Sequence, residues 1–156
     1  MGTCHFQRNF QDLFFDDQIS TVRVIAAEGV AAIVETAGSQ WLQADLMPAI
    51  KERYEGSEQH LACVSTPRGC KVFGKIGAEF SAQLLNDVTE LCVKGLVDTV
   101  PNVKFVACQT LTALCNKKCL DAGIVANQIK PAVEKLVSSE DLDVQFYARA
   151  CIAKCA

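Results

Sequence analysis

The chain has 156 residues, half of them apolar and about a fifth charged, with a formal net charge of −3. Such a chain can bury a core, and its length fits one ordinary domain or a short repeat array. The negative charge and the lack of a basic stripe argue against nucleic acid as the main partner. No apolar run approaches the roughly 20 residues of a membrane-spanning helix, and the start, MGTCHFQRNFQDLFF, does not have the pattern of a secretion signal. We therefore expect neither a nucleic-acid partner nor a membrane partner.

The nine cysteines indicate in which cellular compartment the protein is expected. Because their number is odd and a secretion signal is missing, we expect no disulfide framework and a reducing compartment, the cytoplasm or the nucleus. Cys115 and Cys119 share a helix face, as do Cys151 and Cys155, so a zinc site built from the two pairs is conceivable. Their spacing is not that of the usual zinc motifs, and free cysteine behaves as a small buried hydrophobe. We expect reduced, mostly buried thiols and no metal or other cofactor.

The first clear element is an inner helix, TVRVIAAEGVAAIV, at Thr21–Val34. Its apolar residues recur at helical spacing around a small central residue, Ala26. The same pattern returns later in the chain, where Ala107 and then Ala148 fall on Ala26. Such a small residue lets a neighbouring helix approach closely. An acidic residue stands near the start of the copies, which suits the positive end of a helix dipole.

A second, outer helix follows each full copy and contains a proline. Leu42–Tyr54 pairs with Val125–Val137, and Pro48 then falls on Pro131. A proline inside a helix removes an internal hydrogen bond and bends the helix. The shared position predicts a repeated kink in the two outer helices.

The copy between these two is degenerate. Its inner helix falls on CVSTPRGCKVFGK, where Pro67, Gly69 and Gly74 weaken a helix interior. Its outer helix, Phe80–Leu96, is clear. One side of that helix is apolar, formed by Leu84, Leu85, Val88, Leu91 and Cys92.

The period of about 40 residues with two helices per unit is typical of HEAT or armadillo arrays. There is no room for the extra short helix of an armadillo unit, so HEAT repeats are the better interpretation. We expect one all-α domain, a right-handed α-α superhelix of about three helix pairs with half a repeat at each end, because single units cannot bury their apolar faces. Its expected parts are a partial repeat (1–17), a repeat (18–55), a degenerate repeat (56–96), a repeat (97–139) and a last inner helix (140–156).

Several segments carry a resemblance to a known family. PNVKFVACQTL and DLDVQFYARACI resemble HEAT inner helices of the form D-x-x-V-R-x-x-A-x-x-x-L. The segment IKPAVEKLVSSEDLDVQFYARACIAKCA is similar to the C-terminus of the scaffold (A) subunits of protein phosphatase 2A, and STVRVIAAEGVAAIVETAGSQWLQADLMPAI is similar to an upstream repeat of that family. The likeness covers residues 10–156 and is poor from Leu61 to Lys75. Gln145 stands where a basic residue is usual in the family.

This resemblance implies a non-catalytic scaffold that binds a serine/threonine phosphatase catalytic subunit through the turns inside each helix pair. In a full-length array, the N-terminal repeats hold regulatory subunits. Because the chain matches only the C-terminal repeats and begins inside a repeat, we expect a fragment or a truncated gene product. The implied contact residues on the three turns are Ser39, Gln40, Trp41, Glu79, Phe80, Asn116, Lys117 and Lys118.

Trp41 is the candidate we single out, because tryptophan is enriched among interface hot spots. It is the only tryptophan of the chain. We expect it in the turn, exposed in the free protein; the alternative is that it packs over its own helix pair. For Lys117 and Lys118 the alternative is a solvated loop, since surface charges contribute little.

No catalytic motif is present, so we expect no enzyme. His5 and His60 are the only histidines, and neither belongs to a nucleophile motif or to the paired His-Glu motifs of HEAT-like metal hydroxylases. GKIGAE is glycine-rich but lacks phosphate-loop spacing. The alternative function is another HEAT adaptor, of the transport or chaperone kind, with a peptide or protein on its concave face. The inner helices offer no acidic ladder or Trp-Asn array for a basic peptide, which favours the phosphatase scaffold.

Overall fold

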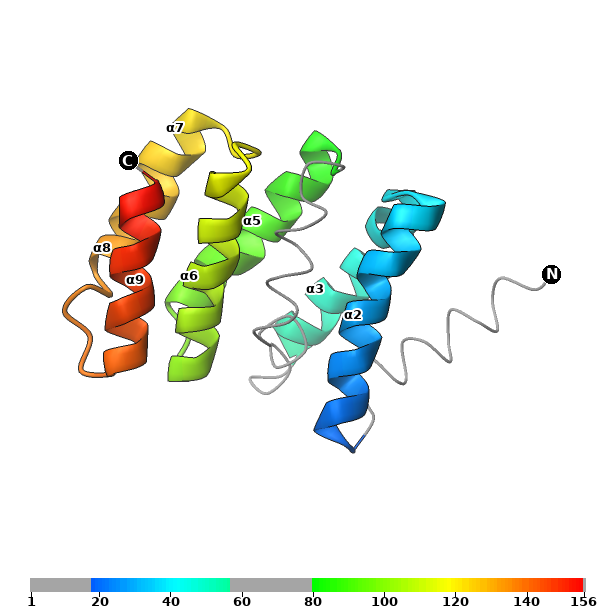
Figure 1. The fold of residues 1–156 in the computed structure, drawn as a ribbon, viewed down its shortest axis with the longest axis horizontal. Coiled ribbons are helices and arrows are strands. Elements are labelled where there is room, and N and C mark those ends of the chain that lie inside the picture. Colours follow the sequence, from blue (N-terminus) through cyan, green and yellow to red (C-terminus); the bar gives the residue numbers. More distant parts are fainter. Residues whose placement is uncertain (1–17, 57–79, 156) are drawn as a thin grey trace.

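The computed structural model describes residues 18–56 and 80–155, and every regular element in these ranges is helical (Figure 1). The expectation of an all-α chain is confirmed for this part of the protein. None of the described helices is long and apolar enough to cross a membrane. The partial repeat 1–17, the degenerate inner helix with Pro67 and Gly69, and both histidines lie outside the described residues. The elements are α2 (Ser20–Ala37), the π-helical turn η2 (Leu42–Leu46), α3 (Met47–Gly56), α5 (Ala82–Leu96), α6 (Pro101–Asn116), α7 (Ala122–Ile124), the π-helical turn η4 (Val125–Ile129), α8 (Lys130–Glu134) and α9 (Leu142–Lys154).

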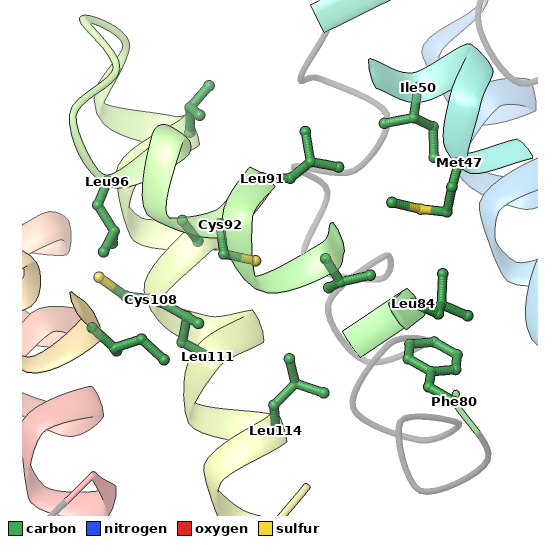
Figure 2. Packing of buried hydrophobic residues seen from close by; sticks show 14 of the residues in the cluster. Met47, Ile50, Phe80, Leu84, Leu91, Cys92, Leu96, Cys108, Leu111 and Leu114 are labelled. Carbon is green, nitrogen blue, oxygen red and sulfur yellow. The ribbon is translucent and has the colours of Figure 1, made fainter. Parts of the chain in front are cut away.

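A single apolar cluster runs from α2 to α9. Figure 2 shows part of it, with Met47 and Ile50 of α3 on one side and Leu111 and Leu114 of α6 on the other. The apolar side expected for α5 is buried, except that Leu85 is only partly covered. Between α3 and α5 an ion pair adds to these contacts: Lys51 Nζ lies 2.6 Å from Asp87 Oδ1, and Gln83 donates to the same oxygen.

The small residue at the centre of each repeated segment is buried, as expected. Ala26, Ala107 and Ala148 are 9%, 6% and 0% exposed. A Cβ atom added to Gly95 of α5 would lie 3.3 Å from the Cβ of Ala107, tighter than most packed pairs. Helix α5 therefore crosses α6 closely because both helices carry a small residue at the crossing. Helix α9 in turn packs on α6 and α8.

Both outer helices contain the same irregularity. In each, a five-residue π turn ends two residues before the proline: η2 precedes Pro48 and η4 precedes Pro131. Proline has no N–H to donate, and π turns inside α-helices locally change the hydrogen-bond pattern that proline interrupts. The two outer helices are therefore irregular at the same place, as predicted, and the irregularity is a π turn beside the proline. The second outer helix ends at Glu134, three residues before the predicted end.

Side-chain caps set the first residue of α5 and of α9. Ser81 Oγ accepts a hydrogen bond from the Leu84 N–H at 3.1 Å, so α5 begins two residues after the predicted start. Asp141 accepts from the Val144 N–H at 3.0 Å and begins α9. Asp98 behaves otherwise, because its carboxylate accepts from the Val100 N–H at 2.8 Å, ahead of α6. The acidic residue expected at the start of this inner helix instead folds the turn before it.

The cap at Asp141 leads to the first prediction. Asp141→Ala should lower the free energy of unfolding by about 1 kcal/mol, because it removes the partner of a first-turn N–H group. Asp143→Ala is the matched control, since Asp143 lies exposed in the first turn and caps nothing. Urea unfolding followed by circular dichroism measures both. Equal losses for the two variants would contradict a capping role.

Candidate partner-binding edge

Three turns that the resemblance implicates lie along one edge of the molecule. In Figure 1, the connection from α2 to η2, the start of α5 and the connection from α6 to α7 all lie at the upper edge. The α5–α6 turn and the connection from α8 to α9 lie at the opposite edge. The helix pairs therefore place the predicted contact segments on the same side, as a binding ridge requires.

The first turn is shorter than predicted. Gly38 has φ 83°, a conformation that suits glycine after a helix end, and its N–H donates to the Val34 carbonyl at 2.9 Å. Gln40 already begins the next helix, so Trp41 lies in a helical turn. Trp41 is also half-buried and packs against the apolar core. The expectation of an exposed loop tryptophan is therefore wrong, because the chain turns within two residues and Trp41 packs partly against the apolar cluster.

Phe80 at the second turn is buried. It is 8% exposed and lies beside Leu84 (Figure 2), so it anchors the start of α5 in the core. The next residue, Ser81, donates a hydrogen bond to Gln43 Oε1 at 2.7 Å, which joins the start of α5 to η2. An exposed contact side chain at Phe80 is thus excluded, and Glu79 lies outside the described residues.

The third turn is exposed at Asn116, Lys117 and Lys118. Lys118 adopts a left-handed conformation with φ 54°, and its N–H donates to the Cys115 carbonyl at 2.9 Å. This is the usual way to end a helix, although glycine is the residue that favours it. The turn presents two lysines and an asparagine to solvent, as either a contact or a solvated loop requires.

A pocket of about 410 Å³ lies behind the third turn. Two of its lining thiols face each other: Cys115 Sγ lies 2.8 Å from Cys155 Sγ, and Cys151 Sγ lies 3.8 Å from Cys155 Sγ. All six described cysteines are free thiols, but only Cys92, Cys108 and Cys151 are fully buried. The lining residues are Cys115, Lys118, Leu120, Ala122, Val125, Ala126, Lys130, Lys154 and Cys155.

This thiol cluster favours a single negative charge, on Cys155. Hydrogen bonds from Cys115 and Cys151, with a smaller contribution from the cation of Lys130, hold the pKa of Cys155 well below its ordinary value against the effect of burial. The same hydrogen bonds, together with burial, raise the pKa values of Cys115 and Cys151. Burial raises the pKa of Cys108 to about 12. Within this coupled group, ionisation of Cys155 is therefore favoured over ionisation of Cys115 or Cys151.

The geometry does not form a zinc site from the two cysteine pairs. Two thiolates on one tetrahedral zinc ion lie about 3.8 Å apart, since each Zn–S bond is about 2.3 Å, whereas Cys115 and Cys155 are 2.8 Å apart. Within residues 18–56 and 80–155, no group of three or more His, Cys, Asp or Glu has the arrangement of a metal site.

Comparison with family models and with curated protein sequences returned no match for this chain.

Proposed function

We propose that the chain is a non-catalytic HEAT-repeat scaffold segment that binds a serine/threonine phosphatase catalytic subunit through the turns inside its helix pairs. We infer this partner from the sequence likeness to phosphatase 2A scaffold subunits. In a longer array, further repeats would hold regulatory subunits. The free thiols of the described cysteines fit a reducing compartment, the cytoplasm or the nucleus.

One observation carries this proposal: the α2–α3 turn, the start of α5 and the α6–α7 turn lie on one edge (Figure 1). A repeated helix pair with an equivalent π turn and proline supports the stacking of like units, as in a HEAT solenoid. Among the predicted contact residues, Gln40 and the third turn are exposed, and Ser39 and Trp41 are partly exposed, so all of them are accessible to a partner.

Trp41→Ala tests the proposed interface. We expect binding to a purified phosphatase catalytic subunit to weaken by about 2 kcal/mol, close to thirtyfold, as for other interface tryptophans. Because Trp41 packs partly against the core, the variant should also lose about 1–2 kcal/mol of folding stability. Biolayer interferometry gives the dissociation constant and thermal melting gives the stability.

Val30→Ala separates the two effects. Val30 is 2% exposed in α2 and away from the turn, so its truncation lowers stability without changing the edge. The interface proposal requires that Val30→Ala bind nearly as well as the parent while Trp41→Ala does not. Equal binding losses, or a parent chain that binds no catalytic subunit, would count against it. Capture of a peptide that Trp41→Ala leaves unaffected would favour the adaptor with a concave-face ligand.

A further inference from the structure

The strongest feature that the scaffold function does not use is the pair of thiols behind the third turn. We infer that Cys155 and Cys115 form a peroxide-reactive pair, in which Cys155 attacks the peroxide and Cys115 then closes a disulfide between α9 and α6. The inference rests on the local geometry and does not depend on the proposed phosphatase partner.

The two sulfur atoms are placed for bond formation. Their separation is 2.8 Å, so a disulfide of about 2.0 Å needs a side-chain movement of less than about 1 Å. Cys151 is the competing partner, but its sulfur lies 3.8 Å from that of Cys155 and its side chain is fully buried. Cys115 is therefore the nearer resolving thiol, and the bond would join two helices that already pack together.

The surroundings of Cys155 favour a nucleophilic thiolate. It sits at the C-terminal end of α9, where backbone carbonyls disfavour an anion. Two thiol neighbours and the charge of Lys130 act in the opposite direction and lower the pKa of Cys155. Lys118 and Lys154 line the same pocket and make it cationic. Cys155 is half-buried and lines that pocket, so a molecule as small as hydrogen peroxide can reach it.

The chemistry balances with peroxide as the oxidant. The Cys155 thiolate attacks one peroxide oxygen, the O–O bond breaks, and hydroxide leaves, which gives a sulfenic acid. The Cys115 sulfur then attacks the Cys155 sulfur, and its thiol proton leaves with the hydroxyl group as water. The hydroxide takes a proton from solvent. Two cysteines lose two electrons in total, and one peroxide becomes two waters.

The modification would act on the exposed third turn. Cys115 lies next to Asn116, and the N–H of Lys118 donates to the Cys115 carbonyl. A bond from Cys115 to α9 would fix the end of α6 and with it the position of this turn. The third turn, with Asn116, Lys117 and Lys118, would therefore be held more firmly in the oxidised protein than in the reduced protein.

Trypsin separates the relevant thiols, which makes the test direct. Cleavage after Lys104, Lys117, Arg149 and Lys154 places Cys115 in fragment 105–117, Cys151 in 150–154 and Cys155 in 155–156. The reduced full chain is treated with a small excess of hydrogen peroxide at pH 7, free thiols are alkylated, and the digest is analysed by mass spectrometry. We expect 105–117 linked to 155–156, with fragmentation assigning the bond to Cys115 rather than Cys108, and loss of the link on reduction.

Variants and labelling rates complete the test. Cys155→Ser and Cys115→Ser should each abolish the link, whereas Cys119→Ser, which alters a half-buried cysteine of the same turn, should leave it intact. In the parent, iodoacetamide at pH 7 should label Cys155 at least about tenfold faster than Cys119, because only the thiolate reacts. A dominant Cys151–Cys155 link, labelling of Cys155 no faster than of Cys119, or equimolar zinc in the purified protein would overturn the inference. The parent digest decides the question even if a variant fails to fold.

Discussion

Replacing Leu111 by alanine should lower the free energy of unfolding by about 3 kcal/mol, within the range found for buried leucines. Leu111 is fully buried in α6 and belongs to the apolar cluster that joins α6 to its neighbours (Figure 2). Truncation removes apolar area and leaves a cavity that packed helices fill only in part. Urea unfolding followed at 222 nm measures the loss.

The repeat supplies a matched control for this variant. Ile152 of α9 falls on Leu111 when the two inner helices are aligned, yet it is only partly buried. Ile152→Ala should therefore cost about 1 kcal/mol, in proportion to the smaller apolar area removed from water. A loss for Ile152→Ala as large as that for Leu111→Ala would mean that burial in the described structure does not set these stabilities.

The helices and their buried faces could be predicted from the sequence because both depend on local spacing. Apolar residues at intervals of three and four residues define a helix face, and the alanine that recurs at the same place in three copies is buried in each of them. Proline within a helix marked the irregular outer helices, although the sequence did not distinguish a kink from a π turn.

The exposure of the turn residues could not be predicted in the same way. Whether Trp41 lies in a loop or in a helix depends on where the flanking helices end and begin. Helix α2 continues to Ala37, three residues past the predicted end at Val34, and the next helix already begins at Gln40. Phe80 was predicted at the edge as one of the contact residues that the resemblance implies. Its burial depends on contacts with residues of other helices, such as those shown in Figure 2.

The sequence alone indicated only part of the thiol cluster. The alignment of α6 with α9 places Cys155 on Leu114, the residue before Cys115, so a contact between the two thiols could have been suspected. Side-chain direction settles it, because Cys115 and Cys155 point toward each other across the α6–α9 contact. Spacing within each helix suggested a metal site instead, since it gives no information on how the two helices are placed.

Enlarging Ala148 should also lower the free energy of unfolding, but by overpacking the core, whereas Leu111→Ala leaves a cavity. Ala148 is fully buried where α9 packs on α6 and α8. Ala148→Leu adds three carbon atoms at a fully buried position, so the helices must separate or the side chain must adopt a strained rotamer. We expect a loss of about 2 kcal/mol in the free energy of unfolding, as for other overpacked cores.

Ala153→Leu is the control, because Ala153 lies on the same helix and is exposed. It should change the free energy of unfolding by no more than about 0.5 kcal/mol. Moving α9 away from α6 should also separate Cys155 from Cys115, so Ala148→Leu is expected to reduce the yield of the peroxide-induced cross-link while Ala153→Leu preserves it. If Ala148→Leu were as stable as the parent, α9 could not be packed against α6 through its alanine, and the close crossing inferred from the repeated small residue would be wrong.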